Sequence, residues 1–131
     1  ANAAPALAAT LRDPVIGVAA WACLALENVA DPATLPSLRR YSARLQSLAA
    51  AGRIPETVGH VDALLVQSAR TRLFLGDKAA KQDLISLLLS DDLYSRQQAI
   101  DTLELEYGER RGYDPSASAR DRRAAAGRWS E

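Results

Sequence analysis

The sequence is poor in the residue types that most often mark a chemistry. Its 131 residues include one cysteine, one histidine and no methionine. A lone thiol, Cys23, excludes an internal disulfide and a cysteine-based metal site. No motif pairs Cys23 or any serine with His60, so we expect His60 to be a partly exposed loop residue. The sequence therefore predicts a protein that is not an enzyme and that holds no cofactor or metal.

Aromatic residues are also scarce, at 5% of the chain, although hydrophobic residues in total reach 48%. Alanine and leucine dominate that fraction, which favours close-packed helices over β-sheets. The nearest approach to a membrane span is the uncharged stretch at residues 15–26, and its 12 residues are too few to cross a bilayer. We expect a soluble protein without membrane contact, and the sequence does not decide between a cytoplasmic and an exported one.

The sequence also has no net charge, because 16 basic residues balance 16 acidic ones. Neutralising phosphates needs surplus Lys and Arg, so we expect no nucleic-acid partner. Residues 61–107 carry 5 basic and 8 acidic side chains, whereas residues 108–131 carry 6 arginines and 4 acids. The acidic segment lacks the glycine-centred loop of a calcium site. We interpret both segments as solvated helix faces, with a phosphate or acidic partner as the alternative for the arginines.

Helix breakers divide the chain into helix-sized blocks. They are Asp13-Pro14, Asp31-Pro32, Gly76-Asp77, Asp91-Asp92, Gly108 and Asp114-Pro115. In an Asp-Pro pair the carboxylate can cap the helix start while proline takes the first position, where no donor is missed. Between the breakers the apolar residues recur at helical spacing, and no long stretch alternates as a strand would. The pattern predicts about seven helices, at residues 5–12, 15–29, 33–50, 58–75, 78–90, 93–107 and 116–129.

Most links between these helices are two to four residues long, which favours antiparallel neighbours. The link at residues 50–59 is longer, and it is either a binding element or a tolerated insertion. A short helix followed by a longer one recurs along the chain: Leu7 and Leu11 match Ile85 and Leu89 at an offset of 78. That offset corresponds to two helical-pair repeats of ~39 residues each.

Two stretches resemble the HEAT-repeat pattern. One is AAWACLALENVADP at residues 19–32, followed by Leu35 and Leu38, and the other is Leu75-Gly76-Asp77, followed by Leu84, Leu88, Asp91-Asp92, Arg96, Ala99 and Leu103. Gly112-Tyr113-Asp114-Pro115, leading to Arg122 and Trp129, is similar to a closing segment of many bacterial HEAT-repeat proteins. Gly17 departs from the pattern, because the family usually places Arg or Lys there.

The resemblance covers most of the chain and implies an all-α fold, an α-solenoid of antiparallel helical pairs in a right-handed superhelical stack. We expect one domain, 1–131, with repeats at about 5–31, 32–76 and 77–108 and a C-terminal cap at 109–131. Trp129 is expected to close the end of the core, and Ser118 with Asp121 to form a capping box. Because solenoids usually hold more repeats, we expect the chain to be a piece of a longer protein.

Residues 15–26 lack the polar face of an ordinary surface helix. They are either covered on both sides within a longer solenoid, or they expose Trp21 or Val18 to a partner. Stacked helical pairs present their second helices on a concave surface. We therefore expect a protein–protein interaction or scaffold module that binds an unidentified protein partner. The candidate partner-binding residues, expected to be exposed, are Trp21, Arg70, Arg72, Gln98, Asp101 and Thr102.

Three other functions stay open. The first is a structural spacer within a larger multidomain chain. The second is a HEAT-like lyase subunit that handles a tetrapyrrole, although the His-Glu iron-binding pair of some HEAT-like enzymes is missing. The third is a nucleic-acid-binding module that uses a basic groove.

Overall fold

The structure is a computed structural model that describes residues 3–130, so residues 1, 2 and 131 of the expected domain lie outside the described part. The described residues are all-helical, as the composition predicts, and contain no strand. The helices are α1 (Ala4–Thr10), α2 (Ile16–Val29), α3 (Leu35–Ala50), α4 (Val61–Phe74), α5 (Ala80–Leu87), α6 (Leu93–Tyr107) and α7 (Ala119–Trp129). Two 3₁₀ turns, Pro32–Thr34 and Glu56–Val58, precede α3 and α4.

Four helices, α3, α4, α5 and α7, begin two or three residues later than the sequence predicts. The Asp31 carboxylate accepts a hydrogen bond from the Ala33 amide at 3.0 Å, yet it opens the 3₁₀ turn and α3 follows at Leu35. His60 caps α4, its Nδ1 accepting from the Asp62 amide at 3.0 Å. Ser118 caps α7 through the Asp121 amide. In each case a local turn satisfies the backbone first, and the helix starts after it.

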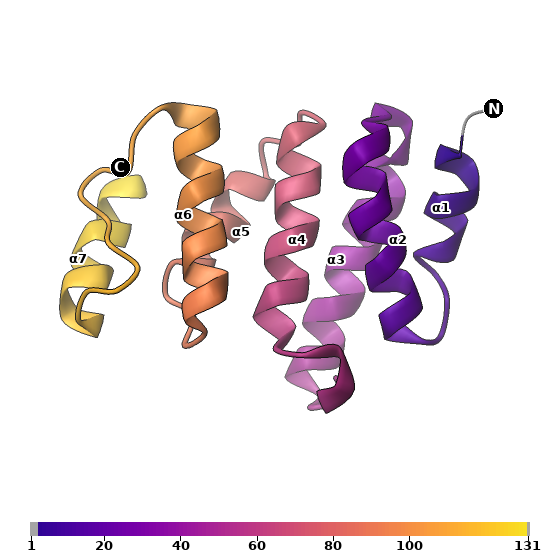
Figure 1. Ribbon diagram of the computed structural model, residues 1–131, viewed down its shortest axis with the longest axis horizontal. Coiled ribbons are helices and arrows are strands. Elements are labelled where there is room, and N and C mark those ends of the chain that lie inside the picture. Colours follow the sequence, from indigo (N-terminus) through magenta and orange to yellow (C-terminus); the bar gives the residue numbers. More distant parts are fainter. Residues whose placement is uncertain (1–2, 131) are drawn as a thin grey trace.

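Helices α2, α4 and α6 stand side by side across the molecule (Figure 1), with α3 and α5 behind them and α1 and α7 at the two ends. Helix α4 is central, because it packs against α2, α3, α5 and α6. Side chains exposed on α2, α4 and α6 therefore share one face of the molecule.

Two clusters of buried side chains form the core. The first joins α1, α2 and α3 through residues that include Leu11, Leu26, Leu38 and Leu45. The second joins α4, α5, α6 and α7. Leu65 of α4 packs against both clusters, so α4 links the two halves of the molecule.

Trp129 closes the C-terminal end of the core, as the sequence predicts. Its side chain is 2% exposed, and its indole Nε1 donates to the Arg110 carbonyl at 3.1 Å. The Arg111 guanidinium covers the indole ring at 4.3 Å from the ring centroid. The Tyr113 hydroxyl donates to the Leu88 carbonyl, which ties the segment before α7 to the end of α5.

Candidate interaction surface

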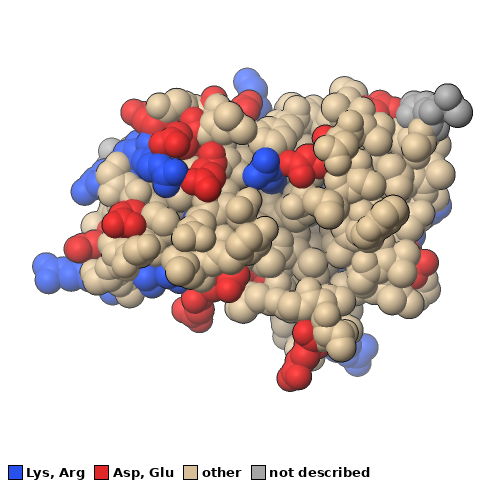
Figure 2. All heavy atoms as spheres, in the orientation of Figure 1, with Lys and Arg blue, Asp and Glu red and all other residues tan. Residues whose placement is uncertain are grey.

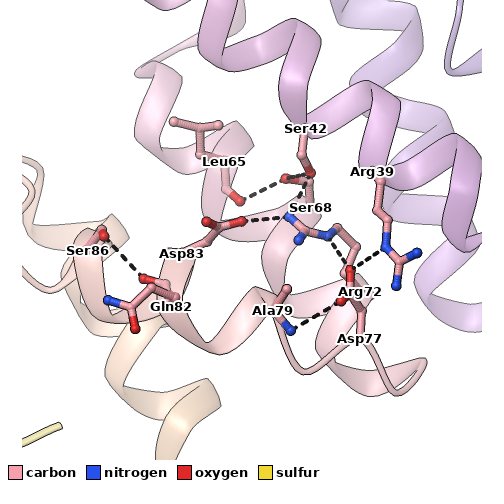
Figure 3. Close-up of polar contacts among 10 residues, drawn as sticks. All are labelled: Arg39, Ser42, Leu65, Ser68, Arg72, Asp77, Ala79, Gln82, Asp83 and Ser86. Atoms are coloured by element: carbon pink, nitrogen blue, oxygen red, sulfur yellow. Dashed lines mark hydrogen bonds and ion pairs between the residues drawn. The ribbon is translucent and has the colours of Figure 1, made fainter. Parts of the chain in front are cut away.

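A buried polar network joins α3, α4 and the start of α5 (Figure 3). Arg72 lies at its centre, with 8% of its side chain exposed. The Arg72 Nε donates to Asp77 Oδ2 at 3.0 Å, and Nη1 donates to Asp83 Oδ2 at 2.7 Å and to Ser42 Oγ at 3.2 Å. The expectation that Arg72 is exposed is therefore wrong: its guanidinium is enclosed, and its Nε and Nη1 donate to groups of this chain.

Asp77 is the anion that two arginines share. Its Oδ2 also accepts from Arg39 Nε at 3.0 Å, and its Oδ1 accepts from the Ala79 amide at 3.2 Å. Burial disfavours the charged carboxylate, but the hydrogen bonds from Arg39 and Arg72 outweigh it and hold the pKa of Asp77 below its ordinary value. The ionised Asp77 fixes the turn between α4 and α5, but it does not cap α5 itself, because the N-cap residue of that helix is Ala79.

Thr102 is also buried, at 1% exposure, so its expected exposure is wrong as well. Its hydroxyl donates to the Gln98 carbonyl at 2.7 Å. The expected exposure of Thr102 and Arg72 is wrong for the same reason. Each lies three positions after a buried alanine, Ala99 and Ala69 respectively. Side chains three apart share a helix face, and this face turns inward.

Arg70 and Gln98 do lie together, in a polar row that crosses α2, α4 and α6. The Arg70 Nε donates to Glu27 Oε1 at 2.5 Å, and its Nη1 donates to Gln98 Oε1 at 3.2 Å. Gln67 Nε2 donates to the other Glu27 oxygen at 2.8 Å. The Arg70 side chain keeps 31% exposure and covers the Phe74 ring. Arg70 thus holds three helices in register and presents only part of its surface to solvent.

Asp101 is the most exposed charged residue of the predicted set, at 52% of its side chain. One of its oxygens accepts from Arg110 Nη2 at 2.6 Å, and Arg110 Nε donates to Glu104 Oε2 at 2.9 Å. Asp101 therefore lies at the rim of the face, beside the segment that leads to α7.

An apolar trough lies over the first half of α4. Trp21 and Leu24 of α2 form one wall, at 68% and 50% exposure, and Tyr94 of α6 contributes 55% exposed surface to the other. Ala63 and Leu64 of α4 lie between them, and the hollow holds about 330 Å³. Figure 2 shows few charges over α2 and α4, whereas acidic and basic side chains gather over α6 and α7.

The sequence singled out Trp21 through the absence of charge in residues 15–26, but it missed Leu24 and Tyr94. Five of those twelve residues are buried, including Ile16 and Cys23, while Val18 stays 41% exposed. Leu24 lies in the same uncharged stretch, so the absence of charge could have identified it as well. Tyr94 lies 70 positions beyond Leu24, and only the packing of α6 against α4 brings it to this face.

Cys23 lies in the first core cluster, and His60 caps a helix. Cys23 is 1% exposed, and burial raises the pKa of its thiol to about 12, so the thiol is neutral. His60 is exposed, as expected, and caps α4. Within residues 3–130 no group of His, Cys, Asp or Glu is arranged to hold a metal ion. None of the helices described is long and apolar enough to cross a bilayer.

Comparison with known proteins adds no relative. Searches against protein-family models, curated proteins and solved structures each return no match.

Proposed function

We propose that this chain is a HEAT-type helical-repeat module that binds a protein partner on the face formed by α2, α4 and α6. The observation that carries the proposal is the trough walled by Trp21, Leu24 and Tyr94. Contiguous apolar surface is costly in water, and large aromatic side chains dominate the binding energy of protein interfaces. Trp21 and Tyr94 are large aromatic residues, and each exposes more than half of its surface to solvent.

The arrangement of helices supports the solenoid part of the proposal. Every second helix, α2, α4 and α6, stands in one row, and the intervening α3 and α5 stand behind (Figure 1). Stacked helical pairs give such an order, because each short link returns the chain to the other layer.

We expect the trough to be about as wide as one α-helix. Packed helix axes lie about 8–10 Å apart, so α2 and α6 flank α4 at roughly 18 Å from each other. A helix with its side chains is about 10 Å across and fits between the two walls, above the small side chain of Ala63. We propose an amphipathic helix of the partner as the occupant, with its apolar anchors against Trp21, Leu24 and Tyr94.

The polar row of Glu27, Gln67, Arg70 and Gln98 lies further along the same three helices. Its members are already held by one another, so little side-chain freedom is lost when a partner contacts them. The apolar trough supplies the binding energy in this proposal. The polar row and Asp101 at the rim supply orientation and selectivity.

Selection of helical peptides from a displayed library against the purified chain tests the proposal. We expect the selected peptides to shift the backbone amide resonances of α2, α4 and α6. We expect Trp21→Ala and Tyr94→Ala each to weaken binding at least about tenfold, the effect of a hot-spot residue. Leu105→Ala is the matched control, because Leu105 is 69% exposed on α6 and lies outside the trough.

Peptides that bind the Trp21→Ala and Tyr94→Ala proteins as tightly as the unaltered chain would place the contact elsewhere and refute the proposal. The same conclusion follows if no helical peptide is selected. Circular dichroism of each variant checks that the helices are retained.

A further inference from the structure

A second groove lies beneath the long link between α3 and α4, and it meets the trough over α4 at Gly17, which lines both. The α1–α2 turn forms one side of it, the link forms the other, and the end of α3 forms the floor. The groove holds about 480 Å³, more than the trough over α4. That volume is in the range of sites that bind small molecules. The link, whose role the sequence left open, is thus one wall of a groove.

The lining combines apolar side chains with two arginines. Val15, Leu48 and Val58 supply apolar surface, and Arg44 and Arg53 supply the charge. Among the described residues no acidic side chain lines the groove, and the neighbouring Asp13 and Glu56 lie outside the lining.

The two guanidinium groups lack a carboxylate partner among residues 3–130. Arg44 donates to two backbone carbonyls, those of Leu11 at 3.1 Å and Pro14 at 3.2 Å, which fix its side chain against the α1–α2 turn. Arg53 is exposed and free of such contacts in the described part of the chain. The groove therefore has a fixed positive charge and a second, adjustable one beside an apolar wall.

Gly17 keeps this groove open. A Cβ atom at this position would lie 3.5 Å from Val58 Cγ1, which is ordinary van der Waals contact. A longer side chain would extend past that contact into the space between α2 and the link. The absence of a long side chain at residue 17, which departs from the HEAT pattern, is thus part of what shapes the groove.

We propose that this groove binds a carboxylate joined to an apolar chain, with the carboxylate on Arg53 and Arg44 and the chain against Val15, Leu48 and Val58. A guanidinium pairs with a carboxylate through two parallel hydrogen bonds, and the apolar wall gains from burying a hydrocarbon segment. A fatty acid and the free C-terminus of a peptide with apolar last residues share this chemistry. The site shares only Gly17 with the lining of the trough over α4, and it does not depend on the function proposed for that trough.

Isothermal titration with decanoate, and in parallel with the peptide acetyl-Ala-Leu-Val bearing a free carboxylate, tests the proposal. Decanol, acetate and the peptide amide are the matched probes, each lacking one half of the chemistry. We expect at least one carboxylate probe to bind and to shift the amide resonances of residues 15–17, 53–54 and 56–58. We expect its matched probes to bind at least about tenfold more weakly, since a charge-assisted hydrogen bond or a buried chain is lost. Which carboxylate binds identifies the source.

Val15→Asp is the decisive variant. Val15 is the N-cap residue of α2 and has no capping side chain, so aspartate there favours the helix start while placing an anion in the groove. We expect Val15→Asp and Arg53→Gln each to weaken binding at least about tenfold. Arg120→Gln, at an exposed position on α7, is the control and should leave binding unchanged. Failure of both carboxylates to bind, or equal binding to the Val15→Asp protein, would overturn the proposal.

Discussion

Arg72 Nε and Asp77 Oδ2 lie 3.0 Å apart across the turn between α4 and α5, and both side chains are buried. Because Arg72 also reaches Ser42 and Asp83, this pair connects α3, α4 and α5 through one guanidinium (Figure 3). Burying two charges is costly, and their attraction offsets that cost only while every partner is present.

Removal of Arg72 alone should therefore be severely destabilising. We expect Arg72→Ala to lower the free energy of unfolding by about 3 kcal/mol or more, because it leaves Asp77 buried with one arginine. Lysine should not restore stability, since one ammonium group cannot reproduce the forked contacts. Urea denaturation followed by circular dichroism measures the change. Arg120→Ala, on the exposed surface of α7, should change stability by less than about 0.5 kcal/mol.

The lowered pKa of Asp77 predicts how its contribution depends on pH. A carboxyl group whose folded pKa is below its unfolded value stabilises the fold fully above the unfolded value, and this stabilisation is lost as the pH falls through the folded one. The ordinary pKa of an aspartate side chain is 3.8, and the pKa of Asp77 is below that value. We expect Asp77→Asn to be less stable than the unaltered chain by a constant amount from about pH 7 to pH 5. Below about pH 4 the difference should shrink. Urea unfolding midpoints of both proteins, measured at pH 7 and at pH 3, give the difference in stability. A difference that stays constant down to pH 3 would contradict a lowered pKa of Asp77.

The C-caps of α2 and α6 share a left-handed conformation but not a residue type. Ala30 ends α2 with φ 53°, and Gly108 ends α6 with φ 81°. A side chain at such a position costs about 1 kcal/mol. Ala30→Gly should therefore stabilise the protein by up to that amount. Gly108→Ala should destabilise it similarly, because a Cβ there meets no atom within 4 Å and only the backbone is strained. Thermal unfolding midpoints that move in the same direction for both variants would refute this reasoning.

Truncation of the two tryptophans should change the stability of the protein by very different amounts. Trp129 is 2% exposed and closes the second core cluster, so Trp129→Ala should cost about 3–5 kcal/mol. Trp21 is 68% exposed, and Trp21→Ala should change stability by less than about 0.5 kcal/mol. Denaturation monitored by circular dichroism compares them without relying on tryptophan fluorescence. A large loss at Trp21 would mean that its surface is used within the fold and is not free for a partner.

The helices and most of their ends follow from the sequence, because they depend on neighbours a few residues away. Apolar side chains at helical spacing, with Asp31, Gly76 and Gly108 at the boundaries, locate the elements to within a few residues. The starts of α3, α4, α5 and α7 were placed too early because a proline or an acidic residue caps a short turn as readily as a helix. Trp129 as the end of the core was also correct, since a large aromatic side chain near the end of an otherwise polar helix has little else to cover.

By itself, then, the sequence determined an all-helical chain, its order of elements and an uncharged stretch around Trp21. The tertiary structure alone decided which polar side chains are buried, because burial depends on which face of a helix its neighbours cover. It enclosed Arg72 and Thr102, which were expected at the surface. It also brought Tyr94 across from Trp21 and set Arg53 beside Val15, and such contacts between distant segments leave no trace in local periodicity.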